Sequence, residues 1–140
     1  MYGPGQKEAN MTSWGLTILD ETACFELLCR STLGRVGVRL ADDFTIFPVF
    51  YAVVDHNIVF RTGPGTKLTA AVLGTRVVFE VDDAAAGWSV LVRGHARELR
   101  DTAAIARATA QIEHDWPAGV RESYVWIEAE KVTGRKLPDA

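Results

Sequence analysis

One stretch decides how the rest of this chain is interpreted: Ile58-Val59-Phe60-Arg61-Thr62-Gly63-Pro64-Gly65-Thr66-Lys67-Leu68. An apolar strand leads into a glycine-rich turn, and a helical pattern follows. Two cations and two hydroxyl groups surround the turn, namely Arg61, Lys67, Thr62 and Thr66. Glycines leave backbone N–H groups uncovered, and a helix N-terminus adds partial positive charge, so this combination predicts a phosphate-binding site. The alternative is a tight surface turn with a solvated arginine and lysine, because glycine-rich turns are common.

Alternating and β-branched runs on both sides of this turn predict strands. Val36, Val38 and Leu40 alternate with charged residues or glycine, which is the period of a strand with one buried face. Pro48 lacks an N–H group, so its strand must bulge, bend or face something other than a neighbouring strand. Gly94 marks a bulge in a later strand. The expected strands cover residues 36–40, 44–54, 58–62, 76–81, 88–99 and 124–130.

Three helices are expected between these strands. Asp20 is a candidate N-cap for a helix over residues 21–31, and Asp101 is a candidate N-cap for the third helix. The expected helix stops are Gly34, then Gly74 for the short helix over residues 67–73, and Trp116-Pro117 for the third helix. Consecutive strands lie close enough in sequence to pair as antiparallel neighbours. The predicted fold is therefore mainly β (α+β), a six-stranded antiparallel barrel with flanking helices.

Size and composition limit the function classes. The chain has 140 residues and a formal net charge of −3, which suits one domain and argues against a nucleic-acid surface. Residues 1–14 are polar and aperiodic and are expected to form a flexible arm, with one domain over residues 15–140. No apolar run approaches the roughly 20 residues of a membrane span, and the N-terminus does not resemble a signal peptide, so a cytoplasmic location is expected.

The cysteines and histidines predict neither a disulfide nor a metal site. Cys24 and Cys29 are five positions apart in a helical pattern and so point in different directions, and buried packing is expected for both thiols. His56, His95 and His114 are far apart in sequence and show no metal-ligand spacing. His56 is expected to be a solvated residue of a hairpin turn.

Five motifs occur in the order that one known family shows. They are Gly34-Arg35-Val36-Gly37-Val38, Ile46-Phe47-Pro48-Val49-Phe50-Tyr51, the Phe60–Leu68 turn, Phe79-Glu80-Val81-Asp82, and Gly87-Trp88-Ser89-Val90-Leu91-Val92-Arg93-Gly94. The chain resembles the pyridoxamine 5′-phosphate oxidase-like family with the FMN-binding split barrel, and in particular its small nitroimidazole-reductase-like branch. The resemblance covers about residues 15–137.

This resemblance implies a homodimer with two FMN sites at the subunit interface. Arg61 and Lys67 would pair with the FMN phosphate, and Thr62 and Thr66 would add hydrogen bonds. Pro48, Val49, Phe50 and Tyr51 would run beside the isoalloxazine ring, with backbone hydrogen bonds to its polar edge. Trp88 and Ser89 would approach from the later strand, across the dimer. The implied activity is a flavin-dependent oxidoreductase acting on a small planar acceptor, and no catalytic residue is assigned.

The sequence departs from full pyridoxamine phosphate oxidases near its end. Those proteins carry a histidine-containing C-terminal segment, whereas this chain has no histidine after His114. Arg135 is expected to be a solvated cation of the tail, and the alternative is that it reaches a cofactor or the partner subunit. Oxidation of pyridoxamine phosphate itself is therefore not expected. Three alternatives remain open on the same fold: an F420-dependent reductase, a non-catalytic flavin-binding or redox-sensing module, and, more remotely, a haem-binding protein.

Overall fold

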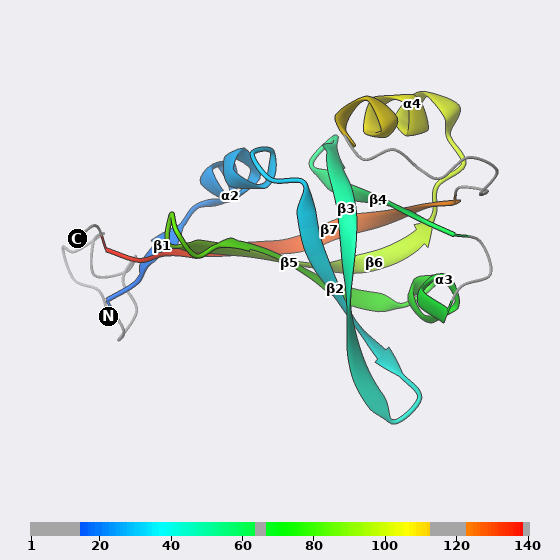
Figure 1. Ribbon diagram of the computed structural model, residues 1–140, viewed down its shortest axis with the longest axis horizontal. Coiled ribbons are helices and arrows are strands. Elements are labelled where there is room, and N and C mark those ends of the chain that lie inside the picture. Colours follow the sequence, from blue (N-terminus) through cyan, green and yellow to red (C-terminus); the bar gives the residue numbers. More distant parts are fainter. Residues whose placement is uncertain (1–14, 64–66, 113–122, 139–140) are drawn as a thin grey trace.

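The computed structural model describes residues 15–63, 67–112 and 123–138. Its elements are β1 (Thr17–Leu19), α2 (Glu21–Leu28), β2 (Leu33–Leu40), β3 (Asp43–Val54), β4 (Asn57–Thr62), α3 (Lys67–Val72), β5 (Arg76–Asp83), β6 (Trp88–Glu98), α4 (Thr102–Gln111) and β7 (Ser123–Lys136). All neighbouring strands are antiparallel, in the order β1-β7-β4-β3-β2-β5-β6, and a further β6–β7 pairing closes the ring (Figure 1). The predicted six-stranded antiparallel barrel with flanking helices is confirmed, with β1 as an extra strand beside β7.

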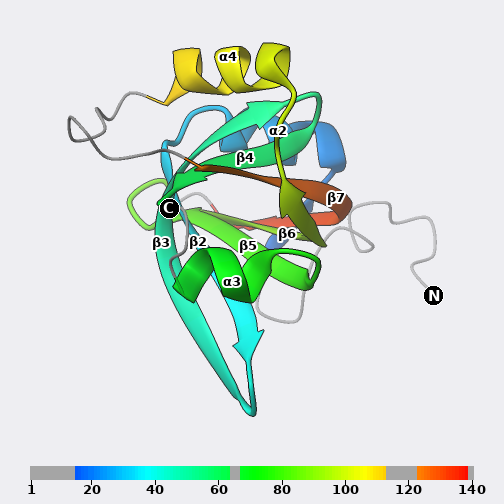
Figure 2. The ribbon, with the colours of Figure 1, turned by 90° about the vertical axis from the view of Figure 1, so that its right-hand side faces the viewer.

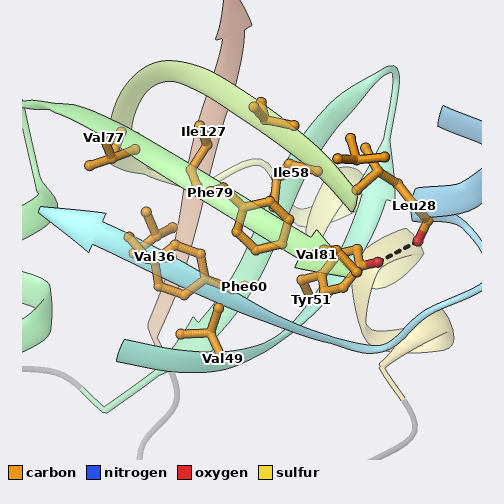
Figure 3. Close-up of a cluster of buried hydrophobic side chains, with 14 of the residues drawn as sticks. Leu28, Val36, Val49, Tyr51, Ile58, Phe60, Val77, Phe79, Val81 and Ile127 are labelled. Carbon is orange, nitrogen blue, oxygen red and sulfur yellow. Dashed lines mark hydrogen bonds between the residues drawn. The ribbon is translucent and has the colours of Figure 1, made fainter. Parts of the chain in front are cut away.

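The main core fills the inside of this barrel (Figure 3). Strand alternation sends every second side chain inward, as in β5, where Val77, Phe79 and Val81 are all at most 3% exposed. The Tyr51 ring meets Phe79 edge-on, with ring centroids 4.9 Å apart. Burial raises the pKa of Tyr51, so its hydroxyl stays protonated and donates a hydrogen bond to the carbonyl oxygen of Leu28.

Two of the expected helix ends need correction. Helix α2 ends at Leu28, whose carbonyl oxygen accepts hydrogen bonds from the Tyr51 hydroxyl and from Ser31 N, so the prediction that it runs to residue 31 is wrong. Gly34 is not the helix stop that we expected, because it lies in β2 beneath the Phe79 ring. A Cβ at Gly34 would lie 2.4 Å from that ring, so glycine is needed there for close packing.

The expected bulge at Gly94 is confirmed. The β6–β7 ladder shifts register between Arg93 and Gly94, and a Cβ at Gly94 would lie 1.9 Å from the Glu128 carbonyl oxygen. Strand β7 continues past residue 130, where the sequence predicted its end, because Gly134 lets it pass directly over the Cys24 sulfur. Arg135 is therefore a strand residue, exposed to solvent but opposite Ser89, and not part of a tail.

Both predicted helix caps are confirmed. Asp20 Oδ1 accepts a hydrogen bond from Ala23 N at 2.8 Å, and Asp101 Oδ1 accepts from Ala103 N at 2.9 Å.

Helix α4 covers a second apolar cluster on the outside of β3, β4 and β7, which includes Ala108 and Trp126. In Figure 2, α4 lies above β4 at the top of the view.

The other expectations about single residues had mixed outcomes. Cys24 is buried as expected, whereas Cys29 is exposed, because it follows the last turn of α2 at the surface.

The turn at Asp55-His56 is confirmed by positive φ angles of 52° and 60°. His56 is exposed, and its ring stacks on Phe25 at 4.7 Å. Residues 1–14 and Trp116-Pro117 lie outside the described residues, so the arm stays a prediction. Helix α4 ends at Gln111, because Ile112 is already extended, so the prediction that Trp116-Pro117 ends this helix is wrong. In the described part of the chain, no helix has the length and apolar character that crossing a membrane requires.

Candidate functional site

The end of β4 carries a buried cation, Arg61. Ile58, Val59 and Phe60 are fully buried, and the strand then ends in Arg61, 9% exposed, and Thr62, 5% exposed. A buried guanidinium is costly to desolvate, so its position at the barrel end needs anionic or hydrogen-bonding partners. Arg61 thus places a positive charge at the end of β4, and positive charge favours a phosphate group.

Helix α3 is tied to this end of β4 by hydroxyl groups. Thr69 Oγ1 donates to the Gly63 carbonyl oxygen at 3.0 Å and lies 3.3 Å from Thr62 Oγ1. Sequence reasoning did not select Thr69, although its position three residues after Thr66 puts it on the first turn of the predicted helix. Lys67 is the first residue of α3, and Thr66 lies outside the described residues. Helix α3 has only six residues, so a phosphate here would depend on side-chain charges more than on a helix dipole.

Strand β3, which contains the residues predicted to lie beside the flavin ring, presents two different faces. Val49 and Tyr51 point into the barrel core and are 5% and 2% exposed, whereas Pro48 is exposed and Phe50 is half-buried. The Tyr51 amide already donates to the Thr32 carbonyl oxygen at 3.0 Å. Within one chain, contacts to a ligand beside this strand would therefore come from Pro48 and Phe50, and from backbone groups before Tyr51.

From Asp43 to Phe50, one edge of β3 has no strand beside it in the described part of the chain. Strand β4 pairs with β3 only from Tyr51 to Val54, whereas β2 pairs with the other edge of β3 continuously from Asp43 to Phe50. Strand β2 pairs with β3 without a register shift at Pro48. The Pro48 nitrogen, which carries no hydrogen, therefore lies on the edge of β3 that faces away from β2. Of the three outcomes expected at Pro48, the ladder shows no bulge, and the edge of β3 away from β2 has no strand beside it among the described residues.

Trp88 and Ser89 lie at the opposite end of the barrel from Arg61. In β7, Tyr124 is opposite Arg61 and Lys136 is opposite Trp88, twelve positions further along. At about 3.3 Å per residue, this separation is roughly 40 Å along the strand. Figure 1 shows the same separation, because β1 lies beside that end of β7 and α3 lies at the other. The structure therefore brings Arg61 and Thr62 together but keeps Trp88 and Ser89 apart from them within one chain.

A hollow of about 370 Å³ surrounds Trp88 and Ser89 and is also lined by Arg135. Ser89 is opposite Arg135 in the β6–β7 ladder, and their side chains share the outer face of the barrel. The sequence favoured a solvated tail position for Arg135 over contact with a cofactor or the partner subunit, because the β7 extension was not predicted. The alternation of Val132 and Gly134 with polar residues could have indicated that the strand continues to this point.

The outer face also holds an acidic pair that sequence reasoning missed. Glu80 Oε1 lies 3.2 Å from Arg35 Nη1, and Asp82 Oδ2 lies 3.5 Å from the same nitrogen. Burial and the nearby Asp82 carboxyl raise the pKa of Glu80 to about 7, and Arg35 only partly opposes this effect. Glu80 can therefore exchange a proton near neutral pH. In the part of the chain that the structure describes, no group of three or more histidine, cysteine or carboxylate side chains could hold a metal ion.

Comparison with known proteins identifies the family. The family model described as pyridoxamine 5′-phosphate oxidase matches residues 20–136. The uncharacterised protein Rv0080 of Mycobacterium tuberculosis is 33% identical, over 96% of this chain and 94% of that protein. The chain therefore belongs to the pyridoxamine 5′-phosphate oxidase family, as the resemblance predicted.

Solved structures agree with this assignment. The FAD binding protein of Mycobacterium smegmatis has a TM-score of 0.78 and 36% identity, with 88% of this chain and all of that chain covered. An FAD-binding protein of Mesorhizobium loti has a TM-score of 0.74 and 25% identity, with 89% and 98% covered. A Bacteroides thetaiotaomicron protein, named for resistance to 5-nitroimidazole antibiotics, shares the fold alone, with a TM-score of 0.66 and 12% identity over 86% and 88% of the two chains.

Proposed function

We propose that this protein is a homodimeric, FMN-dependent oxidoreductase that acts on a small planar acceptor. The observation that carries the proposal is the buried Arg61 at the end of β4, beside the strand-free edge of β3. A guanidinium and the neighbouring threonine hydroxyls match the oxygen atoms of a phosphate, and the edge of β3 offers backbone groups to a polar ring edge. The chemistry of these groups fits a phosphorylated flavin, and two structural neighbours are described as FAD-binding.

The separation of the two halves of the predicted site supports a homodimer. Trp88 and Ser89 lie roughly 40 Å along β7 from the level of Arg61, so one chain cannot place both pairs on one flavin. A second copy that docks its own Trp88 end against the edge of β3 would complete two equal sites. A two-fold dimer has this property, because each surface patch meets its counterpart on the other copy.

Each group of side chains has a separate task in this proposal. FMN supplies the hydride chemistry when it is bound. Arg61 and Lys67 hold the phosphate, Thr62 and Thr66 add hydrogen bonds, and Pro48 and Phe50 cover one side of the ring. The inward-facing Val49 and Tyr51 keep this strand rigid. No protein acid or base is required for hydride transfer, so none is assigned. The reaction is proposed for the cytoplasm.

The test is cofactor extraction with identification by mass, followed by titration of variants. Arg61→Gln and Lys67→Ala should each weaken FMN binding by about 1.5–3 kcal/mol, the usual value of a charge-assisted hydrogen bond in a sheltered site. Arg100→Gln is the matched control, because Arg100 is exposed and pairs with Glu98 at 3.0 Å. FMN binding by the Arg61–Lys67 double variant that equals the parent would contradict the site assignment.

Two alternatives are separated by the same preparation. Binding of deazaflavin F420 without binding of FMN would favour the F420-dependent reductase, and recovery of FAD would extend the site beyond one phosphate. A flavin-binding or redox-sensing module would retain FMN, but NAD(P)H would not reduce it, and nitro or quinone compounds would not reoxidise it. Arg61 favours a phosphorylated cofactor in each case, so the mass of the extracted cofactor decides between them.

A further inference from the structure

A groove on the outer face of the barrel is not used by the proposed flavin site. Strands β2 and β5 pair through only three residue pairs, Arg35–Gly37 with Val78–Glu80. Beyond these pairs the β2–β3 hairpin projects away from the barrel (Figures 1 and 2). A groove of about 480 Å³ opens where the hairpin leaves β5. Its volume lies within the range of small-molecule sites.

The groove has an apolar wall that is open to solvent. Phe44 is 76% exposed and Ile46 is 67% exposed, and both come from the hairpin. Val77 and Val78 line the β5 side. Large apolar side chains that gather in one exposed patch commonly mark a binding surface. A flat organic molecule could cover this wall.

Three arginines line the same groove, namely Arg39, Arg76 and Arg93. Arg76 Nη2 lies 3.4 Å from Glu130 Oε1, and Glu130 also contacts His95 Nδ1 at 3.0 Å. Arg39 and Arg93 form no ion pair with any other residue that the structure describes. The chain as a whole has a net charge of −3, but the arginines give this groove a local excess of positive charge. This charge favours an anionic partner.

The groove lies beside the predicted flavin strand. Ile46 is two residues before Pro48, so the two side chains share the outer face of β3 at a spacing of about 7 Å. The β-bulge between Arg93 and Gly94 lies on the other side of the groove, which Arg93 itself lines. A ligand in the groove would thus touch the edge of the proposed flavin site and a cation at once.

We propose that this groove binds a flat aromatic carboxylate, and that this is the chemical class of acceptor for the proposed flavin enzyme. The apolar hairpin wall covers the ring, and Arg39 and Arg93 hold the carboxylate, with Arg76 partly neutralised by Glu130. Assignment of the ligand as the acceptor rests on the proposed function, whereas the groove itself is defined by this chain alone.

The experiment compares 4-nitrobenzoate with its uncharged analogue 4-nitrobenzamide, by calorimetric titration of the FMN-loaded protein. The carboxylate should bind at least tenfold more tightly than the amide. Arg93→Gln and Arg39→Gln should each weaken carboxylate binding at least fivefold, leave amide binding within twofold and leave the FMN dissociation constant unchanged. Arg100→Gln is the control for loss of a surface cation.

Each outcome decides the proposal. Equal binding of the two compounds, or unchanged carboxylate binding in both variants, would overturn it. A change in the molecular mass of Arg93→Gln in solution would overturn it as well, because the groove would then be a contact between subunits. Arg-dependent carboxylate binding in a protein that takes up no flavin would support the groove and reject the proposed function.

Discussion

At Gly94, strands β6 and β7 approach so closely that a Cβ atom would overlap the Glu128 carbonyl oxygen, at 1.9 Å. The clashing atom belongs to the backbone, which cannot move without breaking the ladder that closes the barrel. Gly34 is different, because its close neighbour is the ring of Phe79, a side chain. Gly37 is different again, since a Cβ there would make an ordinary contact of 3.7 Å with the Val78 carbonyl oxygen.

These contacts predict a graded effect of alanine at single residues. Gly94→Ala should destabilise the protein by about 2–4 kcal/mol, since two strands must separate to accept one methyl group. Gly37→Ala should change the free energy of unfolding by less than about 1 kcal/mol. Urea denaturation of both variants measures the difference. Similar stability of the two variants would show that the β6–β7 contact is not as close as described.

At the scale of elements, α4 is joined to the β3–β4 hairpin by two kinds of contact. The Gln111 side chain forms two hydrogen bonds with the backbone of β3. Its amide group donates to the Val53 carbonyl oxygen at 2.8 Å, and its oxygen accepts from Val53 N at 3.0 Å. Arg107 forms a bidentate ion pair with Asp55, with Nη2–Oδ1 at 2.8 Å and Nη1–Oδ2 at 3.1 Å. The pKa of Asp55 is lowered by the hydrogen bond from Arg107, but both side chains are exposed.

The two contacts should respond differently to mutation and salt. Gln111→Ala should cost about 1–2 kcal/mol of stability at any ionic strength, because it removes two neutral hydrogen bonds. Arg107→Gln should have a smaller effect that disappears at high salt, because exposed ion pairs are screened. Denaturation at low and high salt separates the two. A salt-dependent loss in Gln111→Ala would contradict this account.

At the scale of the whole molecule, Glu80 links barrel stability to pH. Its neighbours Arg35 and Asp82 come from β2 and β5, so the cluster exists only when the barrel is formed. Burial, with Asp82 adding to it, raises the pKa of Glu80 from 4.5 to about 7. Between these values the folded state binds the proton more tightly than the unfolded chain, so this contribution is present below about pH 4.5 and is lost as pH rises through 7.

Glu80→Gln should therefore remove a pH dependence. Relative to the variant, the parent should lose on the order of 1–2 kcal/mol of stability between pH 5 and pH 8, after allowance for partial exposure of the carboxyl. Unfolding midpoints in urea across that range provide the comparison. Parallel pH curves for the parent and Glu80→Gln would show that Glu80 titrates normally in the folded protein.

The sequence by itself determined what depends on residues close together in the chain. The strand periods, the caps Asp20 and Asp101 and the Asp55-His56 turn were all predictable, because each rests on backbone preferences within a few positions. Pairing of β2 with β3, of β3 with β4 and of β5 with β6 followed from the short connections between them, whereas the consecutive strands β4 and β5 do not pair. The motif order also predicted the family, which the comparisons confirmed.

Only the tertiary structure decided which distant residues meet. Arg35 and Glu80 are 45 positions apart, and nothing local specifies that β2 pairs with β5. The same holds for Gly34 beneath Phe79, and for the roughly 40 Å along β7 between the levels of Arg61 and Trp88. Strand pairing is selected by burial of whole faces across the closed barrel, so contacts on its surface and ends arise from the complete arrangement rather than from any single segment.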